Sequence, residues 1–151
     1  MWICLFYQLK IFFMRNIIAF FFSFTFVFAQ SQTFDLNVEI NNIKQKTGNI
    51  EVVIYNSPND FLIKGKALKK YSIKVNNTTS NIAIKGLPKG NYAIAVYHDI
   101  NSDKKFNTNF VGIPVESYGF SNNCKPLLSK PSFEDCMIDI ENSTSICIAL
   151  L

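Results

Sequence analysis

The chain has 151 residues, of which 48% are hydrophobic and 17% charged, and its formal net charge is +4. This length fits one domain of the usual ~100–200 residues and excludes a multidomain enzyme. Nine of the 15 Phe and the single Trp lie within residues 1–29, so the apolar excess belongs to one N-terminal segment, and a polytopic membrane protein is excluded as well.

The N-terminal segment has the pattern of an export signal. Met14 is followed by Arg15 and then by an uncharged run that ends at Val27-Phe28-Ala29. A positive start, a short apolar stretch and small residues at positions −3 and −1 are what signal peptidase accepts. We therefore predict a hydrophobic signal helix that is removed as residues 1–29, and export to the periplasm or the medium.

Two further predictions concern the same segment. We expect Met14 to be the true start, which makes residues 1–13 an extension of the gene model. An uncleaved membrane anchor is the alternative, and it would be the chain's only membrane contact. The apolar run of residues 17–29 is short for a hydrocarbon layer of ~30 Å, which favours cleavage.

Residues 30–151 form the predicted single domain, and they are only weakly basic. They contain 13 Lys, no Arg and 11 acidic residues, which leaves a net charge of +2. Proteins that bind nucleic acids usually present a dense basic face with Arg for bidentate contacts. Nucleic acid is therefore excluded as a partner.

The domain shows a period of two residues, which is typical of β-strands. Phe34, Leu36, Val38 and Ile40 alternate with polar residues, whereas residues 92–97 are apolar on both faces and predict a central strand. Turn residues separate the runs, and Phe61-Leu62-Ile63 is a short apolar run. We predict an all-β fold, an antiparallel seven-stranded Greek-key β-sandwich, with strands at 34–40, 50–55, 71–75, 82–84, 92–97, 133–140 and 145–151.

Three cysteines remain after the predicted cleavage, so at least one thiol is free or intermolecular. In the predicted strands Cys136 shares a face with Ile138 and Ile140, whereas Cys147 points to the opposite side. This disfavours a Cys136–Cys147 disulfide. A Cys124–Cys136 disulfide stays open beside buried free thiols.

The segment 98–123 carries the residues that could do chemistry. Asp99, Asn101, Asp103 and Asn107 occupy positions 1, 3, 5 and 9 of a calcium-binding loop, and the Lys105 carbonyl occupies position 7. Lys104 stands where such loops have Gly, and Phe110 stands where they have Glu. Glu116 could supply the missing carboxylate. The alternative is that these side chains form Asx-turns with their own backbone.

Catalysis is the less favoured hypothesis. A small hydrolase would use His98, Asp99 and Glu116, but His98 and Asp99 are neighbours on a strand, so their side chains diverge. A nucleophile elbow of the Gly-x-Ser-x-Gly type does not occur in the sequence. The segment could instead present a binding surface for a ligand or an exported protein partner, or its aromatic residues could fold inward as a lid. The residues of this surface are His98, Phe106, Phe110, Tyr118, Phe120, Ser121 and Asn122.

Four stretches together resemble a known family: residues 48–58, residues 90–101, residues 112–122 and Pro131-Ser132-Phe133-Glu134. The chain is similar over residues 34–150 to the domain-of-unknown-function family 2141, which contains short exported bacterial proteins. The resemblance implies a transthyretin-like or carboxypeptidase-regulatory-like sandwich and no assigned activity. Lys104 and Asn107 depart from the family's pattern, in which Gly and a further Asp are usual.

Three functions follow from these observations. The first is a non-catalytic binding or accessory module that uses the 98–123 loop. The alternatives are a calcium-stabilised structural domain and the small hydrolase described above. No cofactor other than calcium is expected.

Overall fold

The computed structural model describes residues 32–125 and 129–151, so the predicted signal segment lies outside the described residues. Residues 32–151 form one compact unit. Its strands are β1 (Thr33–Asn41), β2 (Asn49–Tyr55), β3 (Lys69–Lys74), β4 (Ser80–Pro88), β5 (Gly90–Asp99), β6 (Tyr118–Phe120), β7 (Met137–Ile140) and β8 (Thr144–Ala149). Three short helical turns accompany them: η1 (Pro58–Asp60), η2 (Ser121–Asn123) and α2 (Phe133–Cys136). In the described part of the chain, no helix is long and apolar enough to cross a membrane.

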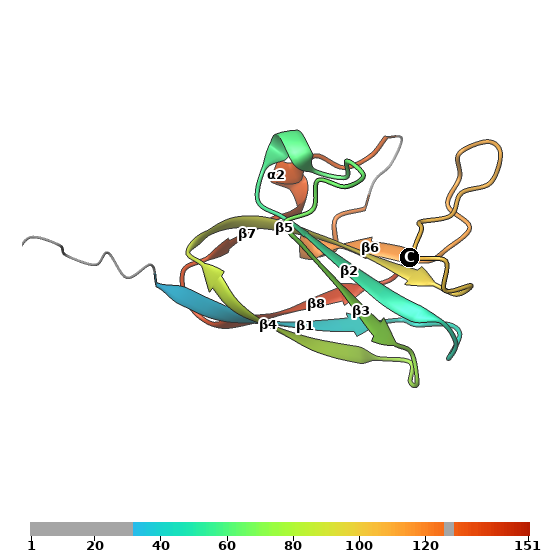
Figure 1. Ribbon diagram of the computed structural model, residues 1–151, viewed down its shortest axis with the longest axis horizontal. Coiled ribbons are helices and arrows are strands. Elements are labelled where there is room, and N and C mark those ends of the chain that lie inside the picture. The colour runs from blue at the N-terminus through green and yellow to red at the C-terminus, as the bar shows by residue number, and fades with distance from the viewer. Residues whose placement is uncertain (1–31, 126–128) are drawn as a thin grey trace, which may run out of the picture. The chain divides into compact units, whose positions relative to one another are not determined.

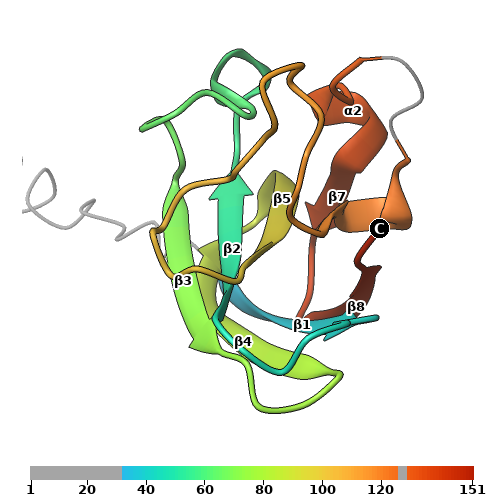
Figure 2. The same ribbon diagram turned by 90° about the vertical axis from the view of Figure 1, so that its right-hand side faces the viewer.

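The strands form two sheets that face each other (Figures 1 and 2). One sheet has the order β4-β1-β8, and the other has the order β3-β2-β5-β6, with β7 also paired to β5. The predicted all-β, two-sheet architecture is confirmed. The prediction of a wholly antiparallel fold is wrong at one place, because β8 lies parallel to β1.

Alternation along the strands builds the core between the sheets. Leu36, Val38 and Ile40 point inward from β1, and Ile148 does so from β8. Successive side chains of a strand point to opposite faces, so each polar residue between them faces outward. The resulting cluster contains Leu36, Val38, Ile40, Ile43, Ile50, Val52, Ile54, Val75, Ile84, Leu87, Tyr92, Ile94, Val96, Ile140, Ile148 and Leu150.

A second apolar cluster covers the outer face of the larger sheet, which explains why β2 and β5 are apolar on both faces. Val53, Tyr55, Ala93, Ala95 and Tyr97 line this face, together with Phe120, Phe133 and Cys136. Figure 1 shows η1 and α2 lying over the sheet. The short apolar run at Phe61 belongs to this cover and not to a strand; its ring packs edge-on to those of Tyr55 and Phe133, with centroids 5.3 and 5.9 Å apart.

The predicted strand 133–140 is wrong in its first half. Ser132 caps a helical turn there: its side chain accepts from the Asp135 amide, and the Asp135 carboxylate accepts from the Ser132 amide. This capping box stabilises a helical start against an extended one. The turn breaks the alternation, so Cys136 enters the outer cluster while Ile140 enters the core between the sheets.

The described residues contain eight strands and not seven, because Tyr118–Phe120 forms β6 inside the predicted loop. Gly119 lies where β6 approaches β8, and a Cβ at this position would lie 2.8 Å from the Ala149 carbonyl oxygen. The Leu151 amide donates to the Tyr118 carbonyl at 2.8 Å. These contacts join the two sheets along one edge.

Candidate functional site

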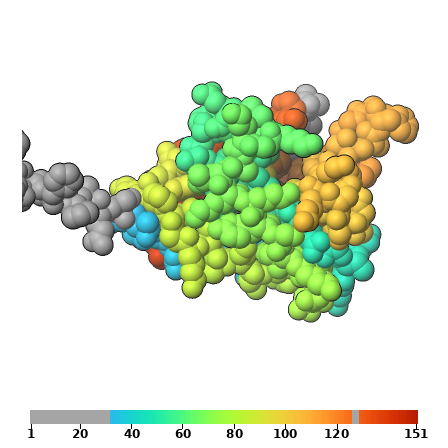
Figure 3. All heavy atoms as spheres, in the orientation of Figure 1, coloured from blue at the N-terminus to red at the C-terminus, as the bar shows by residue number. Residues whose placement is uncertain are grey.

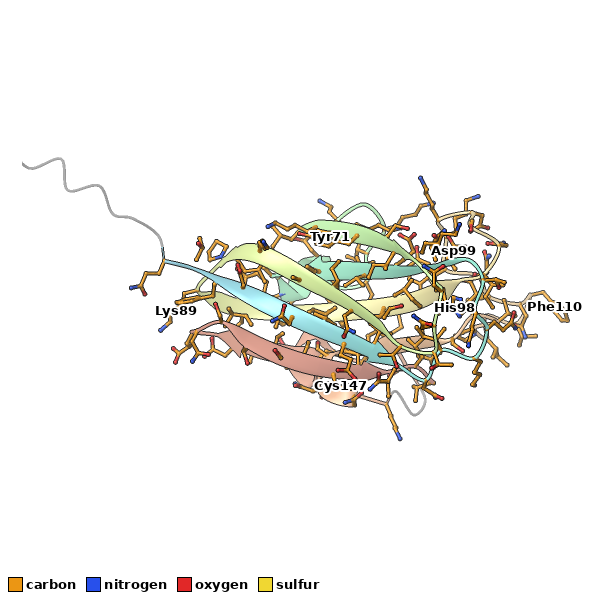
Figure 4. The ribbon with its side chains drawn as sticks, turned by 90° about the horizontal axis from the view of Figure 1, so that it is seen from below. Tyr71, Lys89, His98, Asp99, Phe110 and Cys147 are labelled. Carbon is orange, nitrogen blue, oxygen red and sulfur yellow. The ribbon has the colours of Figure 1, made fainter. Side chains whose placement is uncertain are left out.

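His98 and Asp99 end β5 on opposite faces of the sheet, as alternation requires (Figure 4). Both are buried. His98 Nε2 lies 2.7 Å from the Thr47 carbonyl oxygen, so it donates there. Because Asp99 points away, these two side chains do not form a base positioned by a carboxylate.

Asp99 holds the loop that follows it. Its Oδ1 accepts from the Asp103 amide at 3.1 Å, and its Oδ2 accepts from the Lys104 amide at 2.8 Å. The loop also rests against Gly48, whose absent Cβ would lie 2.2 Å from the Asp99 carbonyl oxygen. The two loop amides thus satisfy both acceptor oxygens of this buried side chain.

Four of the other predicted ligands, Asn101, Asp103, Asn107 and Glu116, are linked by hydrogen bonds. Asp103 Oδ1 accepts from the Lys105 amide at 2.8 Å, which together with further hydrogen bonds from Asn107 and Asn101 lowers the pKa of the Asp103 carboxyl. The Asn107 side-chain amide donates to Asp103 Oδ2 at 3.2 Å and lies 3.5 Å from Glu116 Oε1. Glu116 is buried and its Oε2 also accepts from the Asn107 backbone amide at 2.9 Å. Sequence reasoning therefore brought together residues that do meet in space.

The geometry matches both hypotheses for this loop in part. Lys104 adopts φ +61°, the left-handed conformation for which calcium loops use Gly. The side-chain oxygens, however, are occupied by protein N–H groups, which is the Asx-turn arrangement. Within residues 32–125 and 129–151, no group of three or more His, Cys, Asp or Glu side chains could hold a metal ion. Calcium binding stays a prediction.

The aromatic residues of the predicted binding surface divide into two sets. Phe106, Tyr118 and Phe120 form a row beside Tyr97, with neighbouring ring centroids 5.6 to 5.8 Å apart. Phe120 is buried, Tyr118 is half-buried, and Phe106 covers the row. Phe110 has no such support and is fully exposed.

Ser121 and Asn122 make structural contacts. Ser121 is buried, and its hydroxyl accepts from the Ile94 amide at 3.0 Å and donates to the Cys136 carbonyl. The Asn122 side chain donates to the Met137 carbonyl at 2.7 Å. Their neighbour Asn123 caps the edge of β8, accepting from the Ala149 amide at 2.8 Å.

Residues 106–115 form a projection that we call the finger (Figure 3). Its two arms meet in a β-bridge between Thr108 and Pro114. The finger contains no charged residue. Its apolar side chains are turned outward: Val111 is 69% exposed, Ile113 59% and Val115 61%, and Phe110 stands at its end (Figure 4).

Sequence reasoning missed an ion pair beside this loop, between the buried Glu51 and the exposed Lys70. Glu51 lies on the outer face of β2, accepts from the Ser72 hydroxyl at 2.5 Å and pairs with Lys70 Nζ at 3.2 Å. Lys70 also donates to the Tyr97 hydroxyl at 2.9 Å. Burial works to lower the pKa of Lys70, but its hydrogen bonds to Tyr97 and Glu51 raise it above the ordinary value. A lone Glu inside the apolar run of β2 was the available signal.

Lys70 and Tyr97 connect this ion pair to the loop. Both lie within hydrogen-bond reach of the Lys104 carbonyl, at 3.4 and 3.3 Å. Burial raises the pKa of the Tyr97 hydroxyl despite the neighbouring Lys70 ammonium, so Tyr97 stays a donor at neutral pH. The loop base is thus fixed to β2, β3 and β5.

The three described cysteines carry free thiols. Cys147 is exposed, as the alternation of β8 predicts. Cys136 is buried, and this burial together with a hydrogen bond between its thiol and Cys124 raises the pKa of the Cys136 thiol to about 12. Cys124 packs against the cluster that contains Cys136, and the alternative of a Cys124–Cys136 disulfide is not formed in the structure.

A family model matches most of the described domain. The model of a family described as uncharacterized protein conserved in bacteria, DUF2141, matches residues 38–147. No curated protein and no solved structure matches the chain.

Proposed function

We propose a function for this chain, which belongs to the family DUF2141. It is a non-catalytic binding module, and the finger is the part that binds. Within the 98–123 loop, this assignment narrows the binding surface to residues 106–115. The proposed target offers an apolar region to the finger, because the finger presents apolar side chains and no charge.

The exposure of the finger's side chains is the observation that carries this proposal. Phe110 is fully exposed, and three further aliphatic side chains are more than half exposed on the same ten residues. Single exposed apolar residues are common on soluble proteins, whereas a contiguous group marks an interaction site. Other aromatic residues of the same segment, Phe106 and Tyr118, pack in a row beside Tyr97 on the sheet, whereas Phe110 does not.

The base of the finger supports the proposal in a second way. Asp99 and Asp103 accept from the backbone amides of Lys104 and Lys105 ahead of the first arm, and Glu116, after the second arm, accepts from the Asn107 amide of the first. A binding element that is ordered before it meets its target loses less conformational entropy on binding. The carboxylate and amide side chains of this loop then serve to position the finger.

The two alternative functions fare differently. The hydrolase hypothesis needs His98, Asp99 and Glu116 to converge, and each instead serves a separate backbone contact. A calcium-stabilised loop remains a second proposal, favoured by the left-handed backbone of Lys104 and by Asp103 and Glu116, which both lie within hydrogen-bond reach of the Asn107 side-chain amide. Bound calcium would then reinforce the base of the finger.

Export is also part of the proposal, and the pattern of residues 14–29 supports it. N-terminal sequencing of protein recovered from an exporting bacterial host should start at Gln30 or within a few residues of it. Recovery of the full chain in the membrane fraction would show that the segment is an anchor.

Photo-crosslinking in the exporting bacterium tests the finger. A benzoyl-phenylalanine replaces Phe110 in one variant and Ile63 in the control, because Ile63 is also an exposed apolar residue beside lysines but lies outside the finger. We expect illumination to join position 110, and not position 63, to a lipid or a protein. Equal yields at both positions, or none at position 110, would refute the proposed function.

A further inference from the structure

The finger satisfies most of its backbone N–H groups internally. Of the six residues between Asn109 and Val115 that have an N–H group, five donate it inside the finger. The Asn109 side-chain oxygen accepts two of these bonds, from Val111 at 3.0 Å and from Ile113 at 2.9 Å. The Asn109 amide donates to the Ile113 carbonyl at 2.8 Å, and the Val115 amide to the Asn107 carbonyl at 3.1 Å.

Internal hydrogen bonding of this kind matters most in hydrocarbon. Lipid offers no partner to a backbone N–H, so a segment that enters it must satisfy these groups internally. Pro114 contributes to the same property because it has no N–H. A protein partner, in contrast, usually forms hydrogen bonds with the rim of a binding element, and the tip of this finger has few donors left to offer.

The side chains also fit a lipid surface. Phe110 and Val111 lie on one side of Gly112 and Ile113 and Val115 on the other, and all four are exposed. An anchor for a protein pocket would concentrate its apolar contact on one face, with a polar rim around it. The finger carries exposed apolar side chains before and after Gly112. It is too short to span a bilayer, so its depth would be that of an interfacial element, ~5–10 Å.

The charges at the base complete the argument. Lys104 and Lys105 are exposed immediately before the finger, while Asp99 and Glu116 are buried and hydrogen-bonded. Asp103 is the exposed acid of this base, so the lysines outnumber it. Lysines next to a membrane surface are attracted by anionic headgroups.

We infer that the occupant of the finger is a lipid bilayer, into whose interface the tip inserts while Lys104 and Lys105 contact anionic headgroups. This inference rests on the proposed function and names its target. A protein with an apolar cleft is the competing target, and the experiment separates the two.

Tryptophan fluorescence provides the test. Trp2 is the only Trp of the chain, so residues 32–151, the compact unit with both sheets, contain none. Phe110→Trp in this unit reports on the tip, and Ile63→Trp is the control. With phosphatidylglycerol vesicles we expect a blue shift at position 110 and quenching by brominated acyl chains, and neither at position 63.

Two further variants separate the apolar contribution of Phe110 to vesicle binding from the electrostatic contribution of Lys104 and Lys105. Phe110→Ser should lower the vesicle partition coefficient by roughly 10–100-fold, which corresponds to the transfer free energy of one Phe side chain. Co-sedimentation of residues 32–151 with vesicles measures this coefficient. The pair Lys104→Gln and Lys105→Gln should weaken binding to phosphatidylglycerol and leave binding to phosphatidylcholine unchanged. These residues are exposed, so the urea midpoint of each variant should match that of the wild type.

The outcomes distinguish this inference from the proposed function. No blue shift at position 110, or the same shift at position 63, overturns lipid insertion. If the photo-crosslink from position 110 then joins a protein, the finger is still a binding element and only its target is wrong. If neither assay gives a signal specific to position 110, the proposed function falls as well.

Discussion

Replacement of Ser121 by Ala should destabilise the domain more than any exposed Ser-to-Ala change. Along one edge of β5 the partner strand changes: β7 pairs with Gly90 to Ala93, and β6 pairs with Ala95 to Tyr97. Ile94 lies in the gap between them. The Ser121 hydroxyl fills this gap, accepting from the Ile94 amide at 3.0 Å and donating to the Cys136 carbonyl.

The magnitude follows from what the alanine leaves behind. The Ile94 amide would be buried without a partner, which costs ~1–3 kcal/mol. The Cys136 carbonyl would lose a hydrogen bond worth ~1 kcal/mol. Ser121 is fully buried, so water cannot readily replace the hydroxyl. We expect a loss of about 2–4 kcal/mol in the free energy of unfolding.

Urea denaturation measures this loss. For a slope of ~1–3 kcal/mol per molar, the midpoint should fall by about 1–2 M with the slope unchanged. Ser145→Ala is the matched control, because Ser145 is exposed on β8, and its effect should stay within ~0.5 kcal/mol. If Ser121→Ala shifts the midpoint no further than this control does, the hydroxyl does not bridge the gap in β5.

Three further predictions concern the sheet face, the loop and the thiols. Ala95→Leu should cost ~1–3 kcal/mol by overpacking, because Ala95 is buried in the outer cluster on a central strand; an unchanged melting temperature would contradict this. Asp99→Ala should lower the free energy of unfolding in calcium-free buffer by ~1–3 kcal/mol, since two loop amides lose their acceptor. If the loop binds calcium, ~10 mM calcium should raise the melting temperature of the wild type, because weak extracellular sites have a Kd of ~0.1–1 mM. Magnesium is the control for this measurement. Maleimide at neutral pH should label exposed Cys147 first and Cys136 last, because Cys136 is buried and its thiol pKa is about 12; peptide mass mapping that finds Cys136 labelled as fast as Cys147 would refute the packing.

The sequence by itself determined the strands whose pattern is local. Leu36, Val38 and Ile40 alternate with polar residues, and the pleat of a strand directs such residues to one face whatever the partner is. The same rule placed His98 and Asp99 on opposite faces. It also indicated a central strand at residues 92–97, since only a strand covered on both sides is apolar throughout.

The loop was half determined in this way. Carboxylate and amide side chains at alternate positions favour convergence, and Asp99, Asn101 and Asp103 do converge. Burial was not readable from the spacing. Asp99 is fully buried and holds the loop's amides, whereas Asp103 is exposed, because only the first of them belongs to a strand of the sheet.

Only the tertiary structure decided which aromatic residues turn inward. Phe106 and Phe110 have the same side chain in the same segment, yet Phe106 packs on Tyr97 and Phe110 contacts nothing comparable. The exposure of each side chain depends on whether the sheet lies beneath it, and residues far away in the chain form that sheet. The same holds for Glu51, whose partner Lys70 stands on the neighbouring strand.

The strands that pair with this edge of β5 likewise depend on the tertiary structure. Residues 133–140 look extended by composition, but the Ser132 capping box turns their first half into a helix, and Ser121 then closes the gap that remains between β6 and β7. The side chains of a strand alternate with a period of two residues, so the local sequence is enough to predict which face each one occupies. The filling of a gap depends on which distant side chain reaches it, and the folded chain alone settles that.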